Sequence, residues 1–421
     1  MQPTPLDLVA ASLFGLALIH TFATKQFERL AHRFPRHAGL LHLMGEVEVV
    51  FGFWAVVLIA AMALLSGPDA ALSYAESRNY TEPLFVFVVM VVAASRPILG
   101  TVTKTVDRVA RLMPVPTTLA TTWLGLAAVP LLGSLITEPA AMTIAALLLA
   151  PSVFRPGLPE PVKYIALGVL FVNVSIGGTL TSYAAPPVLM VAATWQWDSA
   201  FMLAAFGWKA AIAVLVNASV ATFALRRHLG APPPASPGTG PQDRPVPVSL
   251  VAVHLALLVG IVLMAHHPVA FLGLFLLFLG VARAYERHQD TLIIRESLLV
   301  AFFLAGLVVL GGLQRWWLQP LVAALEPLAL FFGALGLTAI TDNAALTYLG
   351  SLISGISDEA KYMLVAGAVA GGGLTVIANA PNPAGVALLK RGFADESIGA
   401  GGLLLGAIGP TIVAAAAFLL L

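Results

Sequence analysis

The 421-residue chain contains no cysteine. Without a thiol it can form no disulfide, bind no metal through a thiolate and use no cysteine nucleophile. Charged residues are also scarce, at 10% of the chain, whereas about 25% is usual for a soluble domain. Hydrophobic residues account for 59%. These proportions indicate a single integrated domain that lies in a lipid bilayer.

The sequence also lacks the short motifs of several catalytic classes. It has no glycine-rich phosphate loop followed by a lysine, no nucleophile elbow and no zinc-binding helix. ATP-driven transport therefore has no support in this chain. We predict that the protein is not an enzyme and needs no cofactor. The formal net charge of +1 gives no indication of a nucleic-acid partner, and we predict none.

Long apolar runs follow one another along the chain. A helix crosses a bilayer with about 20 apolar residues, so the length leaves room for about 10–13 spans. We predict an all-α polytopic membrane protein. The runs lie near residues 6–24, 39–66, 83–99, 117–135, 164–181, 200–225, 248–265, 268–284, 297–313, 320–340, 361–380 and 397–421.

A proline-rich segment separates two sets of runs. Seven prolines lie between Ala231 and Val248, a composition typical of a semi-extended linker. We predict a first repeat over residues 1–228, a linker over 229–247 and a second repeat over 248–421.

Lysine and arginine are distributed unevenly among the loops. Fourteen of them lie in loops 25–38, 96–113, 226–247 and 283–295. Only two lie in loops 67–82, 266–267 and 314–319. Because cytoplasmic loops are enriched in these residues, the first group is predicted to be cytoplasmic. The expected protein is then a multi-pass protein of the plasma (inner) membrane with its N-terminus outside, a cytoplasmic linker and no cleavable signal peptide.

Two short motifs each occur twice in the same order. The octet ITEPAAMT (136–143) returns as ITDNAALT (340–347), at an offset of 204 residues. The segment GGTLT (177–181) returns as GGLT (372–375), at an offset near 194, and prolines follow both copies. The charge count orients the matched spans in opposite directions. We therefore predict two inverted repeats related by an axis in the membrane plane.

The octets contain the acids Glu138 and Asp342, each beside a threonine, Thr137 or Thr341. An ionised carboxylate at bilayer depth costs roughly 2.5–3.5 kcal/mol or more unless it faces a cavity, a cation or a partner. Each acid could bind either a proton or a Na⁺ ion, and competition between the two is the simplest mechanism of antiport. The alternative is that both acids are hydrated caps at helix N-termini.

The glycine motifs are followed by polar residues and prolines, a composition expected where a membrane helix breaks and its carbonyls can coordinate an ion. Oxygen ligands of this kind suit a hard cation. The alternative is that the glycines only allow close helix packing, and that the threonines bond to their own helices. The predicted ion site comprises Thr137, Glu138, Thr181, Ser182, Thr341, Asp342, Asn343, Thr375, Asn379 and Asn382.

Other charged residues near the apolar runs have two explanations each. Lys209 lies in the middle of a run, where it either extends toward the headgroups or pairs with an intramembrane acid. Glu46 and Glu48, close to His42, either form a cytoplasmic proton entry or cap the span that they begin. We favour the cap for the two glutamates and keep Lys209 as a possible charge partner.

The motifs resemble the ion transporter superfamily, which includes NhaD-type sodium/proton antiporters, arsenite permeases and divalent anion/sodium symporters. Within it, a bacterial family described as putative Na⁺/H⁺ antiporter is similar in three segments, GGTLTSYAAPP (177–187), TDNAALT (341–347) and ANAPNPAG (378–385). The resemblance covers most of the chain. It implies a homodimer with a scaffold domain at the interface. It also implies a transport domain that has two re-entrant hairpins and two broken helices and moves like an elevator.

The predicted function is exchange of Na⁺, or of Li⁺ or K⁺, for H⁺, with Glu138 and Asp342 as the exchange carboxylates. The symporters of the superfamily carry a Ser-Asn-Thr triplet at each hairpin tip, and its absence at the matching positions argues against a dicarboxylate substrate. The alternative is Na⁺- or H⁺-coupled transport of an anion, held by Lys209 or a helix N-terminus. A channel, a receptor or an intramembrane enzyme stays possible from the sequence.

Overall fold

The computed structural model describes residues 3–229 and 245–421, and within these ranges it is helical, with 22 α-helices and no strand. Six of the described helices are long and apolar enough to cross a membrane, or eight spans if each of two bent helix pairs counts as one. Five further apolar helices have 10–17 residues, which is short for a span. The prediction of an all-α polytopic membrane protein is confirmed.

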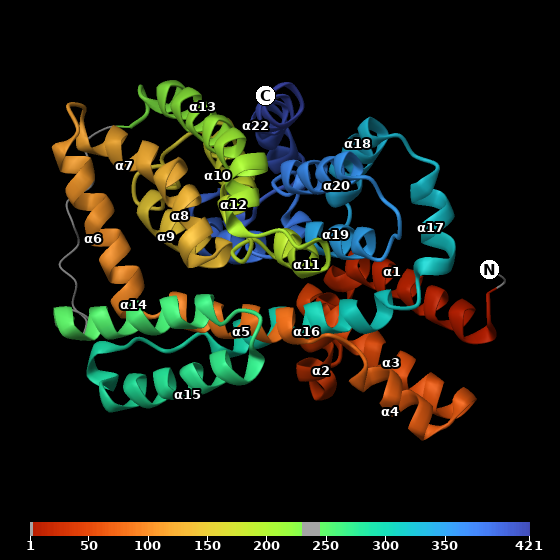
Figure 1. Ribbon diagram of the computed structural model, residues 1–421. Coiled ribbons are helices and arrows are strands. Elements are labelled where there is room, and N and C mark those ends of the chain that lie inside the picture. The colour runs from red at the N-terminus through yellow and green to blue at the C-terminus, as the bar shows by residue number, and fades with distance from the viewer. Residues whose placement is uncertain (1–2, 230–244) are drawn as a thin grey trace.

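The helices form two layers (Figure 1). In the lower layer, α16 packs against α3 and α5. The approach of α16 to α3 requires glycine, because a Cβ at Gly306 would overlap the backbone of Phe51 and Gly52. The lower layer contains α1 (Pro5–Arg33), α2 (Ala38–Gly45), α3 (Val47–Ser66), α4 (Pro68–Glu76), α5 (Thr81–Ala93), α14 (Val248–Leu263), α15 (Pro268–Ala284) and α16 (Ile294–Gly311).

In the upper layer, α10 packs against α22 and α18 packs against α20. Two helices join the layers: α6 (Arg96–Leu112) leads to α7, and α17 (Arg315–Ala323) leads to α18. The upper layer contains α7 (Thr117–Leu126), α8 (Ala128–Ile136), α9 (Glu138–Leu149), α10 (Glu160–Gly177), α11 (Pro186–Trp195), α12 (Ser199–Met202) with the π-helical segment Leu203–Gly207, α13 (Trp208–Leu225), α18 (Pro327–Thr338), α19 (Asn343–Ser351), α20 (Asp358–Gly371), α21 (Asn382–Leu389) and α22 (Ala400–Leu420).

Each layer takes helices from both parts of the chain. In Figure 1 the lower layer combines red and orange helices with green and teal ones, and the upper layer combines orange, yellow and green helices with blue ones. The layers therefore do not coincide with the two halves 1–228 and 248–421. Of the proline-rich linker, residues 230–244 lie outside the described residues, and Pro245 to Pro247 precede α14.

Two hairpins and two broken helices interrupt the upper layer. The α8–α9 hairpin turns at Thr137, and the α18–α19 hairpin turns between Thr338 and Asn343. After α10 the chain passes through a 3₁₀ turn, Gly178–Leu180, and non-helical residues before α11. After α20 it passes through non-helical residues and a 3₁₀ turn, Val376–Ala378, before α21. We call residues 181–185 and 374–381 the first and second unwound segments.

The hairpins and the broken helices pack against each other reciprocally. Helix α11 packs against α19, and α21 packs against α9. Each hairpin therefore meets the broken helix from the other part of the chain.

Buried amides satisfy backbone groups that a bend leaves free. Helices α7 and α8 meet at 42°, and Asn173 Nδ2 of α10 donates to the Leu126 carbonyl at that bend (2.8 Å). Asn217 Nδ2 of α13 in turn donates to Asn173 Oδ1 (3.0 Å). In an apolar medium an unpaired carbonyl is costly, so this pair of amides stabilises the bend.

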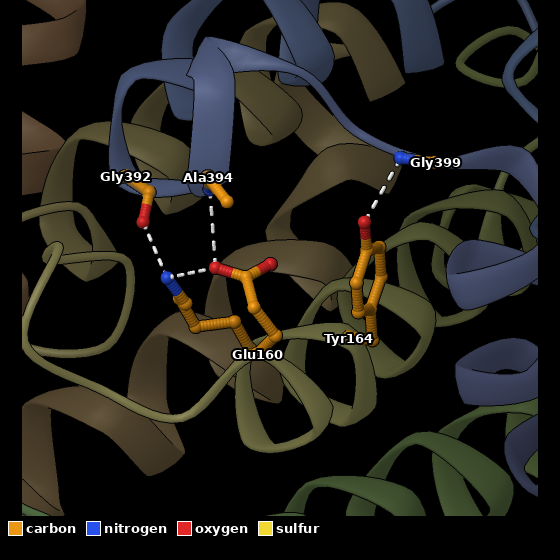
Figure 2. Close-up of polar contacts among 6 residues, drawn as sticks. Glu160, Tyr164, Gly392, Ala394 and Gly399 are labelled. Atoms are coloured by element: carbon orange, nitrogen blue, oxygen red, sulfur yellow. Dashed lines mark hydrogen bonds and ion pairs between the residues drawn. The ribbon is translucent and has the colours of Figure 1, made fainter.

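A second polar cluster attaches α10 to the segment between α21 and α22 (Figure 2). The buried Lys163 Nζ donates to the Gly392 carbonyl (2.5 Å) and forms an ion pair with Glu160 (2.6 Å). Glu160 also accepts from the backbone N–H of Ala394 (3.2 Å), and the Tyr164 hydroxyl accepts from another backbone N–H of the same segment. Early and late parts of the chain are thereby joined within the upper layer.

Candidate functional site

The α8–α9 hairpin positions the first acid. Thr137 has φ of 80°, a backbone conformation that residues with a Cβ seldom adopt and that the surroundings must enforce. Glu138 follows as the first residue of α9, and its side chain is entirely buried. The N-cap of α9 is Thr137, and the Glu138 carboxylate accepts its hydrogen bond from Asn379 and not from the start of α9, so the alternative of a hydrated cap does not describe this buried acid.

Glu138 has few polar neighbours. Its Oε2 accepts a hydrogen bond from Asn379 Nδ2 (2.9 Å), and its Oε1 is buried without a hydrogen-bond partner among the described residues. It forms no ion pair with any base in the described part of the chain. Gly178 lies against the carboxylate, and a Cβ there would overlap it. Glycine at 178 therefore makes room for this side chain.

The α18–α19 hairpin positions the second acid differently. Asp342 is the N-cap of α19, and its Oδ1 accepts from the backbone N–H groups of Ala344 (2.8 Å) and Ala345 (3.1 Å). The capping alternative thus describes Asp342 correctly. No hydrogen bond to Oδ2 is made by a described residue.

Asp342 also lines a cavity of about 30 Å³ between the two layers. A cavity holds a water molecule from about 10–15 Å³, so this one could take one or two waters or one small dehydrated cation. Its lining residues are Val47, Glu48, Val300 and Phe303 from the lower layer, and Asp342, Val376, Ile377, Asn379, Ala380 and Pro383 from the upper layer.

Asn379 connects the two acids. It lies in the second unwound segment, donates to Glu138 and lines the cavity beside Asp342. Its side chain is 1% exposed, and its Oδ1 has no partner among the described residues. The structure therefore brings together Glu138 from one hairpin, Asp342 from the other and one amide from a broken helix.

The two other predicted asparagines lie close to the same region. Asn382 Nδ2 donates to the carbonyls of Gly372 (2.8 Å) and Thr375 (2.9 Å), which stabilises the second unwound segment. Asn343 Nδ2 is 3.5 Å from Ser175 Oγ, a long contact for a hydrogen bond. Both amides are buried, and the Oδ1 of each lacks a partner within the described ranges.

Two predicted threonines join unwound segments to hairpins. Thr181 Oγ1 donates to the Ser134 carbonyl at the end of α8 (2.6 Å). Thr375 Oγ1 donates to the Ala339 carbonyl at the end of α18 (2.8 Å). A hydroxyl that donates keeps lone pairs that can accept or coordinate, so both oxygens stay able to contact an ion.

The other two threonines behave differently. Thr341 Oγ1 donates to the Leu337 carbonyl in the last turn of the preceding helix, α18 (2.8 Å). Thr137 Oγ1, next to Glu138, is buried and has no partner among the described residues.

Ser182 and Lys209 contact other parts of the protein. Ser182 Oγ is 3.2 Å from Ser199 Oγ and lines a different cavity, of about 480 Å³, together with Glu82 and Asp198. Lys209 Nζ donates to the Tyr362 hydroxyl (2.9 Å) and lies 4.6 Å from the centre of that ring. Lys209 pairs with no carboxylate of the described residues, so the geometry does not support a charge-partner role.

The sequence interpretation missed Glu48. We expected Glu46 and Glu48 to cap a span; the N-cap of α3 is Glu46, whose side chain makes no cap hydrogen bond, and Glu48 lies in the first turn. Glu48 instead lines the cavity that contains Asp342 and Asn379. The signal available in the sequence was an acid within a long apolar run, as at Glu138, but nothing in the sequence indicated that α3 faces this site.

Comparisons with known proteins identify a family and a similar fold. Residues 5–421 match the family described as putative Na⁺/H⁺ antiporter. Among solved structures, the chain is similar to the YdaH transporter of Alcanivorax borkumensis, whose topology is described as unusual. The two share 15% identity with a TM-score of 0.50, over 88% of this chain and 96% of that chain, so the likeness concerns the fold alone. A comparison with curated proteins gave no match.

Proposed function

The chain belongs to the putative Na⁺/H⁺ antiporter family, and from that premise we propose that it is a secondary active transporter that exchanges Na⁺, or Li⁺ or K⁺, for H⁺. Family and fold together indicate a transporter and not an enzyme. The wider relationship to NhaD-type antiporters, arsenite permeases and divalent anion/sodium symporters is part of the proposal.

The observation that carries the proposal is the link from Glu138 through Asn379 to the cavity of Asp342. A buried carboxylate with one hydrogen bond and no basic partner is unstable as a bare anion. A proton or a cation can stabilise it, and the two exclude each other. Such competition at one site couples the movement of Na⁺ to the opposite movement of H⁺.

The chemistry of the unpaired groups favours a hard cation. Buried polar atoms in proteins nearly always have partners, but Thr137 Oγ1, Glu138 Oε1 and Asn379 Oδ1 have none among the described residues. All three atoms are oxygens, and their residues are neighbours: Thr137 precedes Glu138, which is bonded to Asn379. Oxygens of carboxylates, amides and hydroxyls are the ligands that hard cations take.

The remaining expectations belong to the same proposal. Two inverted repeats, 1–228 and 248–421, are supported by the matched bonds of Thr181 and Thr375 to hairpin ends. We further propose that the upper layer moves like an elevator against the lower layer, and that the protein is a homodimer in the plasma (inner) membrane. Its N-terminus would be outside and its linker cytoplasmic, as the charge distribution favours.

The test is proton flux in liposomes that contain the purified protein and an internal pH dye. Pulses of Na⁺, Li⁺, K⁺ or a dicarboxylate are added to vesicles that hold a preformed pH gradient. We expect Na⁺ or Li⁺ to dissipate the gradient. A response to the dicarboxylate with no response to any cation would contradict the proposal and favour coupled anion transport.

A further inference from the structure

The cavity beside Asp342 is formed by both layers, and each contributes polar groups. Glu48 enters from the first turn of α3 in the lower layer, and Asp342 and Asn379 enter from the upper layer. The other lining residues are apolar side chains, among them Val300 and Phe303 of α16. The polar groups therefore face a small space with apolar walls, where electrostatic interactions are strong.

The charges around this cavity are unbalanced. The carboxylates of Glu48 and Asp342 have the same sign and repel each other. In the described part of the chain, the base near Glu48 is Arg295, and its guanidinium forms an ion pair with Glu46 (2.5 Å). The carboxylate of the nearby Glu138 adds a third acid, bound to Asn379.

The amide provides a second and independent indication of a ligand. Asn379 is 1% exposed, and its Nδ2 is used by Glu138, so its unpartnered Oδ1 has no donor in the described structure. The Asn379 amide oxygen is buried without a donor and lies near carboxylates. Together these oxygens form a set of ligands that suits a cation.

We propose that Glu48 is a ligand of the transported cation, contributed by the lower layer to a site whose other ligands, Asp342 and Asn379, belong to the upper layer. The inference rests on the proposed function and extends it. Because the ligands come from two layers, the site is complete only in the arrangement described above. Sliding of the upper layer would separate Asp342 from Glu48 and weaken cation binding, so affinity would differ between the two membrane faces.

The first test measures cation affinity at each face. Wild-type protein and the Glu48→Gln variant are reconstituted in one orientation, and the half-saturating Na⁺ concentration is measured for both faces. Loss of a residue that only supports a ligand of a metal site costs about 10–100-fold in affinity, and loss of a ligand itself should cost at least as much. We expect a rise of about tenfold or more at the face from which cations reach the described arrangement, and no change at the other face.

Glu46→Gln is the matched control. It removes a carboxylate two residues away that pairs with Arg295 and does not line the cavity. Glu48→Asp keeps the charge and serves as the second variant if Glu48→Gln folds poorly. Equal Na⁺ affinities for the Glu48→Gln and Glu46→Gln variants at both faces would overturn the inference.

A binding measurement separates this inference from the proposed function. Na⁺ that binds the folded state raises its thermal stability in detergent according to its affinity. If wild type shows no exchange but Na⁺ stabilises it, and Glu48→Gln weakens that stabilisation, the antiport proposal fails and Glu48 is still a ligand. If Na⁺ stabilises wild type and Glu48→Gln equally, Glu48 is not a ligand, whatever the flux shows.

Discussion

Ser175 Oγ of α10 donates a hydrogen bond to the Val369 carbonyl of α20 (2.8 Å), and the two residues are 194 positions apart. That separation matches the offset of about 194 between the two glycine motifs, whose Leu-Thr pairs, 180–181 and 374–375, are also 194 apart. A residue bonded to its own counterpart lies close to the axis that relates two repeats. Gly177 and Gly371, also 194 apart, both lie against a carbonyl of the neighbouring hairpin, in α8 and α18. These matched contacts are the strongest support for the proposed repeat.

Removing either acid should stop exchange. Glu138→Gln and Asp342→Asn keep the size of the side chain and remove the charge that binds a proton or a cation. We expect proton flux in liposomes to fall to the level of empty vesicles, while size-exclusion profiles stay those of wild type. Asp358→Asn, which alters an exposed acid paired with Lys361, is the control. Full exchange by both variants would remove these acids from the site.

Truncating the bridging amide should weaken both folding and binding. Asn379→Ala leaves Glu138 Oε2 without its donor, and an unsatisfied buried polar group costs about 1–3 kcal/mol. We expect a lower melting temperature and a higher half-saturating Na⁺ concentration. Thermal unfolding and flux measured on the same preparation check this. A variant with wild-type Na⁺ affinity would show that Asn379 has a structural role only.

A single methyl group at Gly178 should displace Glu138. Gly178→Ala places a Cβ where the carboxylate lies, and overpacking of this kind costs about 1–3 kcal/mol. We expect a clear loss of exchange. Gly15→Ala is the matched control, because a Cβ there meets nothing within 4 Å. Similar flux in the two variants would mean that exchange does not depend on the position of the Glu138 carboxylate.

Because the chain has no cysteine, an engineered pair would be its only thiols. Val47 and Ala380 line the cavity from opposite layers. In the double variant Val47→Cys/Ala380→Cys, a short thiol crosslinker should stop exchange, and a crosslinker with a reducible bond should allow recovery after reduction. The single variants, treated identically, measure any loss caused by reagent attached in the cavity, and the double variant should lose more exchange than either. Undiminished exchange by fully crosslinked protein would exclude sliding between the layers.

Glu138 and Asp342 could be singled out from the sequence because the signal for them is local. A carboxylate between apolar runs is costly wherever the chain folds, so its presence alone indicates a site. The same reasoning did not distinguish the two acids. Asp342 is the N-cap of α19 and binds two of its backbone amides. Glu138 has the same position in its octet, but it is the first residue of α9 and binds Asn379. The short aspartate reaches its own helix end, and the glutamate side chain reaches another helix.

Two further outcomes depended on packing between distant parts of the chain. From its sequence, Lys209 could pair with an intramembrane acid or extend toward the headgroups. In the structure its ammonium group donates to the Tyr362 hydroxyl of α20. From its sequence Glu48 could cap α3 or belong to a cytoplasmic proton entry. The packing of α3 against α16, beside the second unwound segment, places it in the wall of the cavity that contains Asp342.

By itself the sequence determined the helical membrane class, the positions of the broken helices and the two hairpin acids, because apolar length, glycine, proline and isolated charge act locally. Only the tertiary structure decided that both layers draw on both parts of the chain, that Asn379 joins Glu138 to the cavity of Asp342, and that Ser182 lines a different cavity. These relationships arise from close packing of helices far apart in sequence, which hydropathy and motif spacing do not encode.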